Sequence, residues 1–120
     1  MRILLCLWMA LFFVTITLKA ETYYISAAGD NTDGLTPATA WQTIDKLNTS
    51  FGVIMPGDSI LFNCGETFYG SIIMGSSGTA SAPIVISSFG SGPKPIISGF
   101  TSLAGWTNVG GNIWECDAPA

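Results

Sequence analysis

Histidine is absent from this 120-residue sequence, and its single arginine is Arg2. The lack of histidine excludes a His-based catalytic triad and a histidine-rich metal site within the chain. Charged residues make up only 10% of the sequence, and eight acidic residues stand against four basic ones, for a net charge of −4. A chain with so few cations has no basic surface to hold phosphates, so we expect no nucleic-acid partner.

The longest hydrophobic run lies at the start of the chain. It covers residues 3–14, directly after Arg2, and polar sequence begins at Glu21. A positive start, an apolar middle and a small residue, Ala20, at the end are typical of a secretory signal peptide. We therefore predict a helical, cleaved signal peptide over residues 1–20 and a secreted, extracellular or cell-surface protein. A membrane anchor is the alternative, but the run is shorter than the roughly 20 apolar residues that span a bilayer, so we expect no stable membrane span after cleavage.

The remaining segment, residues 21–120, has the composition of short strands joined by turns. It is rich in Gly, Ser, Thr, Ile and Pro, and its only bases are Lys46 and Lys94. These small and β-branched residues favour strands and tight turns over helices. Its two cysteines, Cys64 and Cys116, can form a disulfide in an oxidising compartment or remain free thiols, and the sequence leaves both alternatives open.

One short helix is predicted in this segment, after a first strand over Thr22–Ser26. Trp41, Ile44 and Leu47 recur at helical spacing, with polar residues between them. This spacing forms one apolar stripe on a helix that Gly52 is placed to end.

A regular repeat follows the helix. Four isoleucines, each 12 residues after the last, lead short apolar segments separated by Gly, Ser and Pro: Ile60, Ile72, Ile84 and Ile96. A fixed period indicates stacked units. Two units make a 24-residue circuit, which predicts Ile84 beside Ile60 and Ile96 beside Ile72 in parallel ladders. The alternative is a set of antiparallel hairpins in a sandwich. Asn112–Cys116, after a double glycine, predicts one more strand.

Candidate site residues are few. Asp30, Asn31 and Asp33 stand before Gly34, and closely spaced oxygens before a glycine resemble the start of a calcium loop, although the same residues also form plain turns without an ion. We therefore predict calcium as a candidate cofactor at Asp30, Asn31 and Asp33.

Two tryptophans and four acids complete the candidates. Trp106 and Trp114 could stack on sugar rings of a polysaccharide or pack against the body of the protein. Glycosidases need two carboxyl groups about 5–10 Å apart, and no spacing selects a pair among four acids: Asp58, Glu66, Glu115 and Asp117. We predict no catalytic residue within this segment.

The order of several short motifs resembles the opening of right-handed parallel β-helix proteins of the pectate-lyase-like superfamily, in particular exported bacterial members. The motifs are Tyr23-Tyr24-Ile25-Ser26, Gly34-Leu35-Thr36, Trp41-Gln42-Thr43-Ile44, Pro56-Gly57-Asp58-Ser59-Ile60, Ala82-Pro83-Ile84 and Gly92-Pro93-Lys94-Pro95-Ile96. The resemblance implies an all-β fold: a parallel β-helix (solenoid) whose early helix caps one end. Residues 21–120 would be the N-terminal cap and about two rungs of a truncated domain, because stacked repeats usually need at least three units.

The resemblance also implies a function. The complete protein would be a secreted, polysaccharide-acting enzyme, a lyase or a glycoside hydrolase, whose catalytic residues lie beyond this segment. The alternatives are a non-catalytic surface or adhesion protein with the same solenoid, and an inactive truncated remnant.

Overall fold

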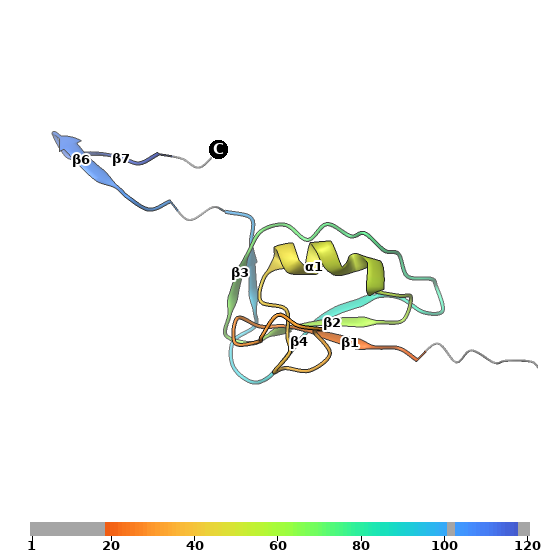
Figure 1. Ribbon diagram of the computed structural model, residues 1–120. Helices are drawn as coiled ribbons and strands as arrows, with labels where there is room; N and C mark the ends of the chain where they lie inside the picture. The colour runs from red at the N-terminus through yellow and green to blue at the C-terminus, as the bar shows by residue number, and fades with distance from the viewer. Residues whose placement is uncertain (1–18, 101–102, 118–120) are drawn as a thin grey trace, which may run out of the picture.

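The computed structural model describes residues 19–100 and 103–117, and their fold is mostly β with one short α-helix (Figure 1). The strands are β1 (Thr22–Ile25), β2 (Ser59–Asn63), β3 (Thr67–Tyr69), β4 (Val85–Phe89), β5 (Ile96–Ser98), β6 (Thr107–Gly110) and β7 (Ile113–Glu115). Helix α1 (Ile44–Ser50) continues into a 3₁₀ turn, η1 (Phe51–Val53). The predicted signal peptide falls almost wholly outside the described residues.

Strands that are distant in sequence pair in parallel. One sheet has the order β1-β2-β4 and a second has the order β3-β5. Tyr23 lies beside Ile60 in the first sheet, and Ile60 lies beside Ile86. In the second sheet Phe68 lies beside Ile97. The prediction of parallel ladders is therefore confirmed for these strands, and the alternative of neighbouring hairpins is wrong for them. The sheets are small and do not close on themselves.

The predicted register is wrong. The 12-residue spacing places Ile84 beside Ile60, whereas the structure places Ile86 there. It also places Ile96 beside Ile72, whereas Ile96 pairs with Thr67 of β3. The connection between β2 and β3 is shorter than that between β4 and β5, so the circuits are not built from equal units.

Ile72 belongs to no strand, because α1 holds the backbone on both sides of it. The Asn48 side chain donates from Nδ2 to the Ser71 carbonyl (2.9 Å) and accepts at Oδ1 from the Ile73 N–H (2.9 Å). Ile72 itself packs against the core. Ile72 is therefore apolar because its side chain packs against the core beneath α1, and not because it pairs in a β-strand.

The helix is shorter than its apolar stripe predicts. It begins after Thr43, whose side chain accepts the Lys46 N–H at 3.1 Å and caps the first turn. Trp41 lies outside the helix, in a parallel bridge with Ile25 along the outer edge of β1. Thr43 is the N-cap, and a capping residue has extended, non-helical backbone. The helix therefore starts only after Thr43 and leaves Trp41 outside it. Gly52 lies inside η1 and does not end α1.

One hydrophobic core joins α1 to the two parallel sheets. Its buried members are Tyr23, Ile25, Trp41, Ile44, Leu47, Phe51, Ile54, Ile60, Phe62 and Phe68. Alternate residues of β1 and β2 face this core, as the period of a strand requires. The core therefore lies between the first layer of strands and α1, at the β1 side of the sheet.

Strands β6 and β7 form an antiparallel hairpin that Figure 1 shows apart from the other strands. The strand predicted over Asn112–Cys116 is confirmed as β7. Cys64 and Cys116 are both free thiols. Within the described residues, no helix is long and apolar enough to cross a membrane.

Candidate functional site

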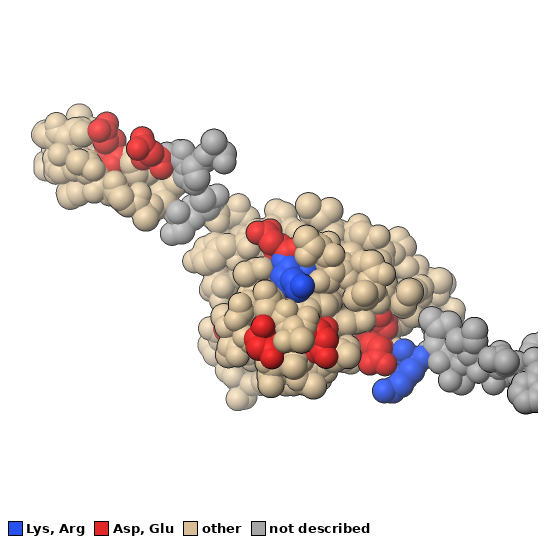
Figure 2. Space-filling view, viewed as in Figure 1, with Lys and Arg blue, Asp and Glu red and all other residues tan. Residues whose placement is uncertain are grey.

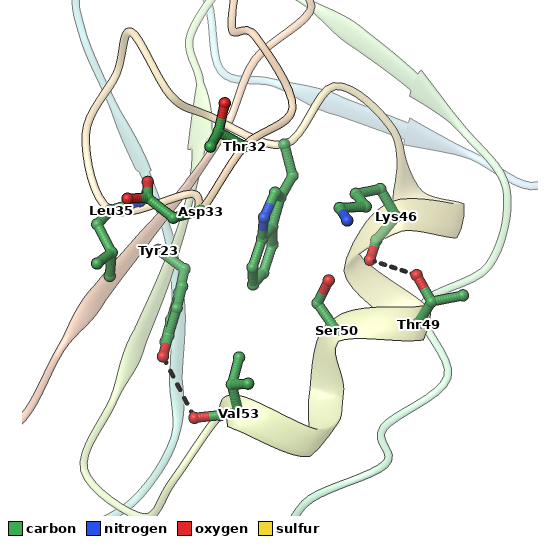
Figure 3. A pocket seen from close by; sticks show the side chains of 9 residues that line it. Tyr23, Thr32, Asp33, Leu35, Lys46, Thr49, Ser50 and Val53 are labelled. Atoms are coloured by element: carbon green, nitrogen blue, oxygen red, sulfur yellow. Dashed lines mark hydrogen bonds between the residues drawn. The ribbon is translucent and has the colours of Figure 1, made fainter.

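A cleft of about 430 Å³ opens between β1, the loop that follows it, and α1 (Figure 3). Nine residues line it: Tyr23, Thr32, Asp33, Leu35, Trp41, Lys46, Thr49, Ser50 and Val53. They come from segments that only the fold brings together. Tyr23 and Trp41 line the cleft and also belong to the hydrophobic core, so the cleft lies against the β1 side of that core.

Two stacked aromatic rings form the floor of the cleft. The centroids of Tyr23 and Trp41 are 5.0 Å apart and their planes lie within 15° of parallel. The Tyr23 hydroxyl donates to the Val53 carbonyl at 3.2 Å. Burial of the phenol, with smaller effects from the carboxylates of Asp58 and Glu21, raises the pKa of Tyr23. The Tyr23 phenol is therefore neutral at pH 7 and is held in place by the Val53 carbonyl.

The rim of the cleft is polar. Figure 3 shows Asp33 and Lys46 on opposite sides of it, the first on the loop and the second on α1. Hydrogen bonds from the Thr39 side chain and the Leu35 N–H lower the pKa of Asp33, so its carboxyl is ionised at neutral pH. The hydroxyl groups of Thr49 and Ser50 stand on the helical side. One carboxylate and one ammonium can bind a polar ligand, but a single carboxyl cannot supply the acid and base pair of a glycosidase.

The predicted calcium residues lie in the loop that borders this cleft, and their side chains accept backbone N–H groups of the loop and of Gln42 at its end. Asp30 Oδ1 accepts the Thr32 N–H (3.0 Å), and Asn31 Oδ1 accepts the Gln42 N–H (3.1 Å). Asp33 Oδ1 accepts the Leu35 N–H at 2.9 Å. The Asp30 and Asp33 bonds, each from the N–H two residues further on, are those of Asx turns, whereas the Asn31 bond reaches across the loop to Gln42. Across residues 19–100 and 103–117, no three His, Cys, Asp or Glu side chains gather to hold a metal, and calcium binding by the loop stays a prediction.

The predicted sugar-stacking residues lie on the hairpin (Trp114) and directly before it (Trp106). Trp106 is 51% exposed and Trp114 is 57% exposed. Trp114 pairs with Asn108 across the hairpin, and the Trp106 indole N–H donates to the Leu103 carbonyl at 3.3 Å. Trp114 thus lies on β7 and Trp106 directly before β6, both exposed to solvent, and sugar contact by them stays a prediction.

Two of the four candidate acids have structural partners. Asp58 is buried and accepts the N–H groups of Glu21 (2.8 Å) and Met55 (2.7 Å). Glu66 accepts from the Ala27 N–H (2.8 Å), the Ser26 hydroxyl and the Asn63 amide. These carboxylates hold β1 against the turns that flank β2.

The other two acids, Glu115 and Asp117, line a hollow of about 170 Å³ at the base of the hairpin. These two acids therefore share one hollow, and the absence of a catalytic residue from this segment stays a prediction.

Sequence reasoning did not find the cleft. The sequence predicts Tyr23 in a strand and both Trp41 and Lys46 in a helix. Each prediction uses only the neighbouring residues in the sequence, so none of them points to a shared cleft. Tyr23, Trp41 and Lys46 come together through the bridge between Ile25 and Trp41, which no local sequence pattern predicts.

The visible surface of the molecule in Figure 2 carries few charged atoms. More of them are acidic than basic, in agreement with the net charge of −4.

The chain is similar to bacterial lacto-N-biosidases. It is 35% identical over 109 residues to the lacto-N-biosidase of Bifidobacterium longum subsp. longum, an alignment that covers 86% of this chain and 6% of that protein. Crystal structures of the GH136 lacto-N-biosidase of Eubacterium ramulus, native and as the selenomethionine derivative, each match with a TM-score of 0.55 and 31% identity over 62% of this chain and 12% of theirs. No family model matches the chain. The chain therefore spans only a small part of the length of these relatives.

Proposed function

We propose that this chain is the N-terminal structural segment of a secreted glycoside hydrolase of the lacto-N-biosidase type. The observation that carries the proposal is the match, in both sequence and structure, to lacto-N-biosidases of two bacterial genera. The sequence match covers 86% of this chain at 35% identity, and the structural match covers 62% of it at 31% identity with a TM-score of 0.55, so both are much longer than a short motif. The relatives are glycosidases by name, so the proposal takes the hydrolase alternative and leaves the lyase alternative aside.

In this proposal residues 21–120 are the capped first layers of a parallel β-solenoid. The support is the parallel register, in which β1, β2 and β4 stack in one sheet and β3 and β5 in another. The outer edge of β1 is covered by its own loop, since the Tyr24 N–H donates to the Gly34 carbonyl (2.7 Å) and the Ser26 N–H to the Trp41 carbonyl (2.9 Å). An end strand with satisfied backbone groups is what a solenoid cap requires.

The catalytic carboxyl pair lies elsewhere in this proposal. Asp58 and Glu66 are committed to backbone and side-chain hydrogen bonds, and Asp33 is alone in its cleft. The segment contributes by capping and by supporting the layers that carry the reaction. Secretion belongs to the proposal as well, and its support is the apolar run after Arg2.

A segment exchange tests this function. The chain replaces the matched segment of the Eubacterium ramulus lacto-N-biosidase, and hydrolysis of a chromogenic lacto-N-bioside is measured. We expect the chimera to retain activity and the 120-residue chain alone to show none. An Ile60→Asp chimera is the matched control, because a carboxylate at this fully buried position should prevent folding. A folded chimera without activity, or activity of the isolated chain, would contradict the proposal, and the first of these results would favour a non-catalytic surface protein.

A further inference from the structure

The hairpin of β6 and β7 has two faces of different chemistry. In its register Thr107 lies beside Glu115, and Asn108 lies beside Trp114. Successive side chains of a strand point to opposite faces of the sheet. Thr107 and Glu115 therefore share one face of the hairpin, and Asn108 and Trp114 share the other.

Trp106 belongs to the face of Asn108 and Trp114. It stands between Gly105 and Thr107, which both line the polar hollow on the opposite side of the hairpin. Trp106 does not line that hollow, and the alternation of side chains places it with Asn108. Trp106 and Trp114 are then diagonal neighbours across the two strands, about 7–8 Å apart, a separation within reach of aromatic side chains. We call Trp106, Asn108 and Trp114 together the aromatic face.

The aromatic face is held in position and open to solvent. The Trp106 indole N–H donates to the Leu103 carbonyl at 3.3 Å, which fixes the ring, and Asn108 Oδ1 accepts the Gly110 N–H at 2.8 Å. The second bond leaves the two N–H groups of the Asn108 amide as donors to a ligand. Every residue of β6 and β7 is exposed, and Figure 1 shows the hairpin apart from the other strands. Within the described residues the two tryptophans thus do not pack into the body of the protein.

The charge of the hairpin limits what this face can bind. Residues 103–117 contain two acids, Glu115 and Asp117, and no lysine or arginine. Figure 2 shows acidic atoms and no basic ones on the visible side of the hairpin. Such a surface repels anions, among them uronate polymers and phosphate groups. Flat aromatic rings beside an amide donor instead suit the apolar C–H faces and the hydroxyl oxygens of neutral pyranose rings.

We infer that the aromatic face binds a neutral oligosaccharide. The choice of a saccharide rests on the proposed function, and the choice of a neutral one rests on the charge of the hairpin. The indoles of Trp106 and Trp114 each stack on one pyranose ring. Asn108 donates from Nδ2 to a hydroxyl or acetamido oxygen between the two rings. The face holds the sugar chain and takes no part in breaking its bonds.

A titration followed by nuclear magnetic resonance tests the inference. The full 120-residue chain, labelled with nitrogen-15, is titrated with lacto-N-tetraose, a neutral tetrasaccharide that contains the lacto-N-biose unit. We expect saturable shifts of the indole N–H signals of Trp106 and Trp114 and of the Asn108 side-chain amide. The Trp41 indole signal should stay in place, because Trp41 is buried in the core. Tetragalacturonate, an anion of equal length, should shift none of these signals.

Residues on the two faces of β7 give a matched pair of variants. Trp114→Ala should weaken binding of lacto-N-tetraose at least about tenfold, whereas Trp114→Phe, which keeps an aromatic ring, should stay within about threefold of the parent. Ile113→Ala should bind as the parent does, because Ile113 is 63% exposed on the opposite face. An unchanged Trp41 signal in each variant shows that the body remains folded.

Asn108→Asp tests the polar contact by itself. The variant keeps an acceptor for the Gly110 N–H and removes both donors that the ligand would use. It should weaken binding about threefold or more, because an unsatisfied sugar oxygen replaces a hydrogen bond. Glu115→Gln, on the other face of the hairpin, should not weaken binding.

Four results would overturn the inference: no saturable shift up to about 10 mM lacto-N-tetraose, equal shifts with tetragalacturonate, equal loss in Ile113→Ala and Trp114→Ala, or a shift at Trp41 in place of Trp106 and Trp114. The last result would place the ligand in the cleft. The titration measures binding without hydrolysis, so its outcome is separable from that of the segment exchange. Binding together with an inactive chimera would contradict the proposed function and leave the aromatic face standing, and an active chimera without binding would do the reverse.

Discussion

The indole of Trp41 stacks on the phenol of Tyr23 at a centroid distance of 5.0 Å, and this pair closes the β1 side of the core. The contact joins residues from different local structures: Tyr23 belongs to β1, and Trp41 follows the long loop and bridges Ile25. Trp41 is only 2% exposed. A large aromatic so placed makes a major contribution to burial at the end of the stack of strands.

Trp41→Ala should therefore destabilise the protein strongly. Loss of a buried tryptophan leaves a cavity and typically costs about 3–5 kcal/mol of unfolding free energy. Urea denaturation followed by circular dichroism measures the change. Trp114→Ala is the control, because Trp114 lies exposed on the hairpin and its loss should change stability by less than about 0.5 kcal/mol. Similar values for the two variants would contradict a role of Trp41 in closing the core.

Gly34→Ala should lower stability through the same stack. Gly34 has φ of +74°, and an added Cβ would lie 2.7 Å from Cε2 of Trp41. The backbone strain and the clash together should cost more than about 1 kcal/mol. Gly52→Ala is the matched control, since Gly52 has no neighbouring atom within 4 Å of an added Cβ and lies in a 3₁₀ turn. Thermal melts of the two variants should differ clearly, with Gly52→Ala equal to or more stable than the parent.

The sequence predicted the strands better than their partners. Thr22–Ser26 has the β-branched and aromatic composition of a strand, and the structure confirms a strand there, β1. The apolar segment led by Ile96 is confirmed as β5. Strand β3 was missed because Gly65 and Gly70, which flank it, read as turn residues and hid the short segment Thr67–Tyr69. Local composition identifies a strand because propensity is local, whereas its neighbour in the sheet depends on the lengths of the connections.

The position of Ile72 shows why the regular spacing gave the wrong register. Its side chain packs on the core as a ladder residue would, but Asn48 of α1 takes the adjacent backbone hydrogen bonds of Ser71 and Ile73. Here a helix side chain makes the hydrogen bonds that a neighbouring strand would otherwise make. The spacing of apolar residues in the sequence cannot reveal such a replacement. The cleft was missed for a related reason, because Tyr23 and Lys46 are brought together only by the fold.

Asp58→Ala should destabilise the junction between β1 and β2. The buried carboxylate accepts the N–H groups of Glu21 and Met55, and its removal would leave both donors without this partner. Each unsatisfied buried donor costs about 1–3 kcal/mol. Both bonds are only partly buried, so we expect a loss in the lower part of the combined range, about 2–4 kcal/mol, in urea denaturation. Asp58→Asn retains one acceptor and should lose less. The structural role would be contradicted if the alanine variant were as stable as the parent.

Glu66 should make stability depend on acid pH. Partial burial of its carboxyl opposes ionisation, but hydrogen bonds from the Ala27 N–H, Asn63 and Ser26 outweigh that effect and lower the pKa below the ordinary value of 4.5. A lowered folded-state pKa means that the unfolded chain binds the proton more tightly. The stabilisation is therefore fully present above about pH 4.5 and is lost as the pH falls through the lower, folded-state pKa.

Glu66→Gln tests this dependence by difference. At pH 7 the variant should be less stable than the parent by about 1–2 kcal/mol, because hydrogen bonds to a charged acceptor are stronger than those to an amide. The gap should narrow as the pH is lowered from 5 toward 3, since the parent then protonates the same group. Guanidinium denaturation across this range measures both curves. Glu115→Gln, on the exposed hairpin, is the control and should run parallel to the parent at every pH. A gap between parent and Glu66→Gln that stayed constant with pH would show that the network stabilises the fold through shape alone and not through the charge of Glu66.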